Sequence, residues 1–238
     1  MKTAWNALVL ATVGSFAVAG ASGAVTLDAS AWINGDDPIK ENQSGTSTTG
    51  SDYVHIHGNG DLAVLTDYTL ATPFDFSGHA YAPADDDIFG VLFGYVDGFN
   101  NYRISWTGGE DHDWEAGRRY GGLMLVEESN GEATTLWRDP DLMWLAGVEY
   151  NFWLHVDYEE VSFELREGNE VLADFSVFGD FTDVDGRAGV FTRSNAVSFY
   201  NLSDQPLAPL HVTPLPGGLP LLLGGAGLLL IRKRRRTV

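Results

Sequence analysis

The fold of this chain is set by an alternating segment in its second half, which reads Tyr150-Asn151-Phe152-Trp153-Leu154-His155-Val156-Asp157. In an extended strand Phe152, Leu154 and Val156 fall on one face, and the residues between them fall on the other. A second segment with the same two-residue period follows at residues 161–166. Both segments are predicted to be β-strands with one buried face.

Similar segments recur over most of the chain, and glycine, aspartate and asparagine separate them. Hairpin signals stand at residues 96–102, 128–132 and 167–170. Between the two ends no segment has the pattern of a long amphipathic helix. Many short strands with turns between them predict an all-β sandwich of the jelly-roll type over residues 58–206. Residues 25–57 are predicted to be a polar segment with one possible strand.

Composition limits the possible functions. The chain has 238 residues, of which 44% are hydrophobic, so it is long enough for one sizeable core. A formal charge of -19 at pH 7 argues against nucleic acid or an anionic membrane surface as a partner. Cysteine is absent, so the fold must be stabilised by its core, by bound ions, or by both.

The first 24 residues have the pattern of a secretory signal peptide. Lys2 is followed by an apolar run, and small residues then end at Ala24, where we expect cleavage. The alternative interpretation is a buried core helix. The order of charge, apolar run and small residues favours export.

Residues 207–238 have a different pattern, with a Pro-Leu-Pro motif at Pro214, Leu215 and Pro216 followed by an apolar span that ends at Ile231. Five basic residues follow the span: Arg232, Lys233, Arg234, Arg235 and Arg236. The span of roughly 17 residues, about 25 Å of helix, is at the short limit for crossing a membrane. The basic cluster would stay on the cytoplasmic side and leave the preceding domain outside.

This tail resembles the PEP-CTERM class of bacterial sorting signals, in its VPLPA-type variant. The resemblance implies recognition by a membrane-embedded exosortase and removal of the tail, although Thr213 and Gly217 differ from that motif. The alternative is a plain single-pass anchor. If both ends are removed, 8 basic residues remain against 33 acidic ones, a formal charge of about -25. Such a domain would attract divalent cations.

Asp85, Asp86 and Asp87 form the strongest functional signal, because they lead directly into the apolar segment 88–95. Adjacent carboxylates repel, and a bound cation would neutralise them. Carboxylate oxygens are the ligands that calcium prefers. The triplet therefore predicts a calcium site, and a solvated acidic loop is the alternative.

Several stretches together resemble the thrombospondin C-terminal domain. They are residues 85–95, Asn101-Tyr102-Arg103-Ile104-Ser105-Trp106, Thr135-Leu136-Trp137-Arg138-Asp139-Pro140, residues 167–174, Gly186-Arg187-Ala188-Gly189-Val190-Phe191 and Phe199-Tyr200-Asn201-Leu202. The resemblance implies a lectin-like jelly roll that binds calcium and takes part in adhesion. Asp85, Asp86 and Asp87 match its calcium loop, and Asp61 is a fourth candidate. The chain lacks the aspartate repeats, EGF-like modules and cysteines of animal thrombospondins, so receptor contacts are not implied.

Other motifs keep two rival functions open. A polysaccharide hydrolase would use Asp113 and Glu115, although Asp111 stands where a nucleophilic glutamate is needed. A metal-independent carbohydrate-binding module would use aromatic residues such as Trp106, Trp114 or Trp144.

Two further motifs are weaker. His55 and His57 would share one face of a strand without a nearby third ligand. Asp183 and Asp185 fit a tight turn better than a calcium loop.

The sequence thus predicts a lectin-like jelly-roll sandwich, flanked by a signal peptide and a single membrane-spanning sorting helix. We expect a non-enzymatic, calcium-binding module of the adhesion or matrix type. It would be exported to the cell surface or extracellular matrix, and its partners would be extracellular polysaccharide or a surface protein.

Overall fold

A computed structural model of the chain describes residues 27–36, 38, 45–84, 86–108, 121–182 and 184–207, without the side chains of residues 58–60. The expected signal peptide, with Ala24, and the expected tail from Pro214 to Arg236 lie outside these ranges. In the part of the chain that is described, no helix has the length and apolar character needed to span a membrane.

The described residues form one short 3-10 turn and a series of strands. In chain order they are η1 (Ala29–Ala31), β1 (Ile33–Gly35), β2 (Thr46–Thr49), β3 (Tyr53–Leu65), β4 (Phe74–Tyr81), β5 (Ile88–Asp97), β6 (Asn100–Thr107), β7 (Leu123–Ser129), β8 (Glu132–Asp139), β9 (Glu149–Val156), β10 (Glu160–Glu167), β11 (Glu170–Phe178) and β12 (Arg187–Ser203). The predicted all-β sandwich is confirmed.

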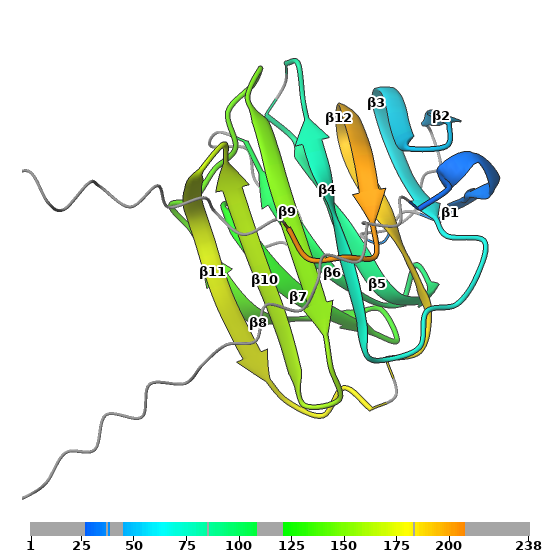
Figure 1. Cartoon of the computed structure of the whole chain (residues 1–238), viewed down its shortest axis with the longest axis vertical. Helices are drawn as coiled ribbons and strands as arrows, with labels where there is room; N and C mark the ends of the chain where they lie inside the picture. Colours follow the sequence, from blue (N-terminus) through cyan, green and yellow to red (C-terminus); the bar gives the residue numbers. More distant parts are fainter. Residues whose placement is uncertain are drawn as a thin grey trace, which may run out of the picture. The chain divides into compact units, whose positions relative to one another are not determined.

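The strands belong to one hydrogen-bonded sheet that folds back on itself into two layers. Its order is β11-β10-β9-β4-β12-β5-β6-β7-β8, with β3 added at β12 and with β1 and β2 paired to β3. In Figure 1 the layer of β11, β10, β9 and β4 faces the viewer, and β5 to β8 lie behind it. Every pairing between these strands is antiparallel.

Strand β12 joins the two layers because its two halves pair differently. Residues 187–193 pair with β5, and residues 198–203 pair with β4. Between them the register with β3 shifts on both sides of Asn195, and Ser194 has a φ of 57°. Such bulges bend a strand and let it pass from one layer to the other. The sequence pattern predicts two separate strands here, at residues 189–191 and 196–202, and the structure joins them in one strand.

The core lies between the layers and follows the alternation seen in the sequence. Phe152, Leu154 and Val156 of β9 are buried, as are Phe163 and Leu165 of β10. Each such side chain contributes about 1.5–3 kcal/mol when it leaves water. The pattern that predicted these strands therefore also supplies the hydrophobic driving force of the sandwich.

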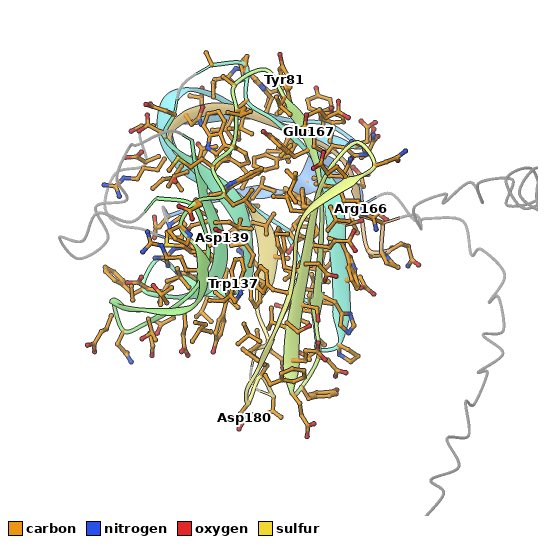
Figure 2. All side chains as sticks on the ribbon, turned by 90° about the vertical axis from the view of Figure 1, so that its left-hand side faces the viewer. Tyr81, Trp137, Asp139, Arg166, Glu167 and Asp180 are labelled. Atoms are coloured by element: carbon orange, nitrogen blue, oxygen red, sulfur yellow. The ribbon has the colours of Figure 1, made fainter. Side chains whose placement is uncertain are left out.

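An aromatic stack joins the strands at the two ends of the sheet order. Trp137 of β8 lies parallel to Phe175 of β11, with ring centroids 3.7 Å apart and planes 9° apart. Figure 2 shows the two layers edge on, with Trp137 labelled. β8 and β11 form no backbone hydrogen bonds with each other. Side-chain packing between Trp137 and Phe175 therefore closes this side of the core.

The other face of β6 is buried as well, and it carries polar groups. Arg103 is 0% exposed, and its Nη1 lies 3.2 Å from Oε2 of Glu128 on β7. The same nitrogen donates to Oδ1 of Asn101 at 3.3 Å. A buried guanidinium requires such partners, because an uncompensated charge is costly away from water.

The sheet also includes residues expected to precede the domain. β1, β2 and the first half of β3 pair within it, so the boundary expected at residue 58 falls inside β3.

Candidate functional site

The loop before β5 carries two described members of the acidic triplet. Asp86 is exposed and Asp87 is half-buried, while Asp85 lies outside the described residues. The backbone N–H of Gly108 donates to the carbonyl of Asp86 at 2.9 Å. The indole N–H of Trp144 donates to the carbonyl of Asp87 at 3.1 Å. The loop backbone is therefore fixed at two successive residues.

Trp144 provides one of these anchors because it is itself immobilised in the core. It is 2% exposed, and its ring centroid lies 5.3 Å from that of Phe89 on β5. Phe89 also contacts Trp106, which is 3% exposed. The interpretation of Trp106 and Trp144 as exposed sugar platforms is therefore wrong, because both indoles are core residues. Trp114 lies outside the described residues.

Asp61 lies on β3 and is fixed to the bulge of β12. Its Oδ1 accepts a hydrogen bond from the backbone N–H of Ser194 at 2.9 Å and lies 3.5 Å from the hydroxyl oxygen of the same residue.

The strand register brings Asp61 and the acidic loop to the same part of β12. Leu62, which follows Asp61, pairs with Thr192, and Ile88, which follows Asp87, pairs with Arg193. Two strand spacings, about 10 Å, thus separate their backbones. Arg193 adds a positive charge to the strand between them.

Asn195, in the same bulge, is a candidate residue that the sequence did not reveal. It is 0% exposed, and among the described residues neither its amide oxygen nor its amide nitrogen has a hydrogen-bond partner. Buried amides in native proteins normally have a partner, which can be a protein group, water or an ion. The only sequence signal was a Ser-Asn pair between two apolar strand segments.

The described side chains do not by themselves complete a metal site. In the ranges that the structure describes, no three histidine, cysteine or carboxylate side chains gather closely enough to hold a metal ion. Calcium takes six to eight oxygen ligands, which include backbone carbonyls and water. Asp61, Asp86, Asp87 and the Asn195 amide offer the right oxygen chemistry, and Asp85 would have to join them.

His55 and His57 lie on the same side of β3, as expected, with ring centroids 4.2 Å apart. The Nδ1 atom of His55 is 2.7 Å from the Ser198 hydroxyl, and the Nε2 atom of His57 is 2.7 Å from the Thr48 hydroxyl. Burial, with a smaller effect of His57, lowers the pKa of His55. These contacts fit a hydroxyl-bonded pair rather than a metal site.

The other acidic motifs are only partly described. Asp111, Asp113 and Glu115 lie outside the described residues, as does Asp183. Asp185 is exposed and comes just before Gly186, which forms a bridge with Leu70.

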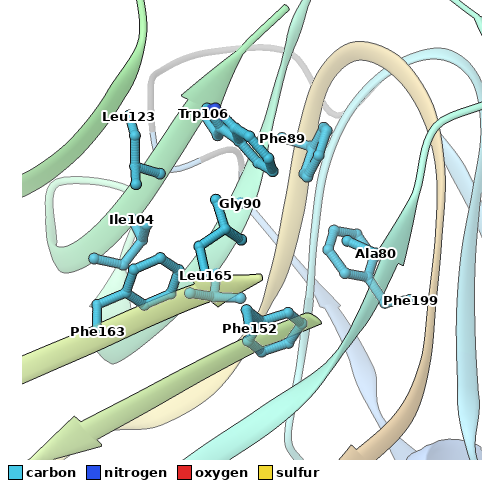
Figure 3. Close-up of a pocket in the computed structure, with 11 residues that line it drawn as sticks. Ala80, Phe89, Gly90, Ile104, Trp106, Leu123, Phe152, Phe163, Leu165 and Phe199 are labelled. Atoms are coloured by element: carbon cyan, nitrogen blue, oxygen red, sulfur yellow. The ribbon is translucent and has the colours of Figure 1, made fainter. Parts of the chain in front are cut away.

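An internal cavity of about 20 Å³ lies between the layers and is shown in Figure 3. Its lining is apolar and includes Phe89, Ile104, Trp106, Phe152 and Phe199. A cavity of this size holds no more than a single water, and an apolar one remains dry. It is a packing defect and provides no site for a substrate.

Comparisons with known proteins relate this chain to thrombospondins in sequence and to a carbohydrate-binding module in fold. Over 166 residues the chain is 30% identical to Thrombospondin-3b of Danio rerio, across 57% of this chain and 18% of that protein. It is 26% identical to Thrombospondin-2 of Homo sapiens over 173 residues, or 60% and 15% of the two chains. The chain thus spans less than a fifth of the length of these thrombospondins. The expected resemblance is confirmed as weak homology.

Solved structures agree with the fold. The carbohydrate-binding module CBM66 of Bacillus subtilis superposes with a TM-score of 0.51 at 13% identity, over 72% of this chain and 92% of that one. A functionally unknown protein of Saccharomyces cerevisiae gives 0.50 at 10% identity, over 76% and 100%. No family model matches the chain. These similarities support the jelly-roll sandwich. They do not identify a ligand, which has to be inferred from the residues of this chain.

Proposed function

We propose that this protein is an exported, non-catalytic binding module of the adhesion or matrix type, in which calcium braces the loop before β5. The observation that carries this proposal is the position of Asp61 and Asp87 on either side of one bulged segment of β12. A cation between β3 and β5 would hold together three strands and the acidic loop. The weak homology to thrombospondins supports an adhesion role.

Calcium would be bound by oxygen atoms of Asp85, Asp86, Asp87 and Asp61, with the Asn195 amide as a further ligand. Extracellular calcium modules bind with a Kd of about 0.1–1 mM. At ~10 mM calcium such a site would stabilise the folded protein by about 1.4–2.7 kcal/mol. For a domain of this size that corresponds to a rise in Tm of roughly 3–11 °C.

The test is calorimetric and thermal titration of the purified protein with calcium, with magnesium as the comparison ion. We expect heat and a rise in Tm with calcium, both lost in an Asp86→Asn, Asp87→Asn double variant. Asp174→Asn is the matched control, since Asp174 is an exposed aspartate on β11, away from the loop. Absence of both heat and thermal shift at ~10 mM calcium would refute the calcium proposal.

Export and processing belong to the same proposal and rest on the sequence of the two ends. Cleavage after Ala24 and removal of the tail after the Pro214 motif by an exosortase-like enzyme would release or display the domain outside the inner membrane. The intact mass of the protein recovered from the cell surface tests both cleavages. A plain anchor would retain residues 232–236.

A hydrolase acting on exopolysaccharide is the rival proposal, and it depends on Asp113 and Glu115. Activity against polysaccharides that disappears in Glu115→Gln would favour the hydrolase. Calcium binding without such activity would favour the binding module.

A further inference from the structure

The outward side of the front layer carries an organised group of polar and aromatic side chains. Because Phe152, Leu154 and Val156 of β9 face the core, Trp153 and His155 face away from it. This side of β9, β4 and β12 faces the viewer in Figure 1. We call it the outer polar face and define it by Asp75, His79, Glu149, Trp153, His155 and Tyr200.

Trp153 is held in one orientation on this face. Its indole N–H donates to Oδ1 of Asp75 at 2.7 Å, and Nδ1 of His155 lies 3.1 Å from the same oxygen. The indole and imidazole centroids are 5.9 Å apart with planes tilted by 30°. The indole is only partly buried. An aromatic ring fixed this way offers stacking area at little further entropic cost.

A second cluster on the same face joins β9, β4 and β12. The Tyr200 hydroxyl donates to Oε2 of Glu149, and Nδ1 of His79 lies 3.2 Å from Oε1 of that carboxylate. The His79 and Tyr200 rings stack with centroids 5.1 Å apart and planes 21° apart. Both oxygens of Glu149 are thus used to position an aromatic pair.

The register sets the two clusters close together, beside Ser77, which is 4% exposed and whose hydroxyl donates to the carbonyl of Gln205 in the segment after β12. Trp153 pairs with Ser77 of β4, while His79, two residues along β4, pairs with Tyr200. Two strand spacings across and two residues along give about 12 Å between the backbones of Trp153 and Tyr200. This span suits a short oligosaccharide segment better than a single sugar.

The charge of the face selects the kind of ligand. Asp75 is 27% exposed and Glu149 is 52% exposed, and the sequence has no lysine between residues 41 and 232. Arg166 of the neighbouring β10 is hydrogen-bonded to Glu164. With a chain charge of -19, uronate, sulfate or phosphate groups would be repelled. Neutral sugars remain, since their hydroxyls pair with carboxylates and imidazoles and their apolar faces stack on indole.

We propose that the outer polar face binds a neutral polysaccharide, with Trp153 as the stacking platform and the Glu149 cluster as a second contact point. The proposal rests on the proposed role as a binding module, but it uses a surface separate from the calcium loop. No bond is made or broken, because the face only holds the polymer.

Native affinity electrophoresis of the purified protein provides the test, in gels containing hydroxyethylcellulose, laminarin, xylan, galactan or mannan, with alginate as the anionic comparison. We expect at least one neutral polymer to retard the protein, and Trp153→Ala to weaken that binding at least about tenfold. Phe99→Ala is the matched control, since Phe99 is 53% exposed in the β5–β6 turn, and it should bind like the wild type.

A second measurement protects the test against a poorly folded variant. In wild-type protein the indole N–H resonance of Trp153, assigned by its absence in Trp153→Phe, should shift when oligosaccharides of the retarding polymer are added. The proposal is overturned if no neutral polymer retards the protein, if alginate alone does, or if Trp153→Ala binds as well as wild type.

Running every gel with calcium and with chelator separates the two proposals. Binding that persists in chelator and requires Trp153 supports polysaccharide binding by the outer polar face, even if the calcium proposal fails. Binding that requires calcium but not Trp153 refutes the proposal for the outer polar face and is consistent with the proposed calcium site.

Discussion

Replacing Arg103 with methionine should strongly destabilise the domain, because it removes the partner of a buried carboxylate. The side chains of Arg103 and Glu128 are 0% and 3% exposed, and their charged atoms are 3.2 Å apart. Removing one member of such a pair costs about 3–5 kcal/mol, since the remaining charge has no water to compensate it. For a domain of this size the Tm should fall by roughly 6–20 °C.

The assay is urea unfolding followed by tryptophan fluorescence, in a double-mutant cycle. Arg103→Met and Glu128→Leu are measured singly, and the Arg103→Met, Glu128→Leu combination is measured beside them. The combination should recover most of the loss, because an apolar pair of similar volume leaves no buried charge. A single variant within about 1 kcal/mol of wild type, or a combination no better than Arg103→Met, would refute this reasoning.

Three further changes test other parts of the structure. Gly90→Ala should abolish soluble expression or cost more than about 3 kcal/mol in urea unfolding, because a Cβ there would lie 1.8 Å from a backbone carbonyl oxygen of β6. Asp61→Ala should cost about 1–3 kcal/mol in the same assay through the unpaired N–H in the bulge, and Asp61→Asn should cost less. The pKa of Glu149 is lowered mainly by a hydrogen bond from Tyr200 and to a smaller extent by one from His79. The ionised Glu149 carboxylate therefore stabilises the folded protein above the unfolded-state pKa, and this contribution is lost as the pH falls through the folded-state pKa. Glu149→Gln should therefore lose stability at pH 7 but little at pH 3, and an equal loss at both would contradict this.

The fold was predictable from sequence where one face of a strand is buried. β9 was visible because an apolar residue recurs at every second position, at Tyr150, Phe152, Leu154 and Val156. β12 was harder to predict, since Ser194 and Asn195 interrupt its apolar pattern and divide it into two strand-length segments. A bulge and a turn use the same residue types, and only the pairing with β3 and β5 distinguishes them.

The candidate sites were predictable only in part, for a related reason. Adjacent acids such as Asp86 and Asp87 are visible in a sequence, whereas the buried amide of Asn195 depends on strand register. The role of the tryptophans was also hidden. Trp106 and Trp144 are buried by contacts between layers, while Trp153 is turned outward by its position between Phe152 and Leu154. Composition alone does not separate these cases.

The pairing of β12 has a mechanical consequence. Ser203, its last residue, leads directly into the remainder of the chain, so a pulling force on that end enters the domain through β12. This strand is hydrogen-bonded to β3, β4 and β5, and its two halves belong to different layers. The force would be shared among three neighbours instead of unzipping one hairpin. Resistance to such a force would thus depend on the pairing of this one strand with all three of its neighbours.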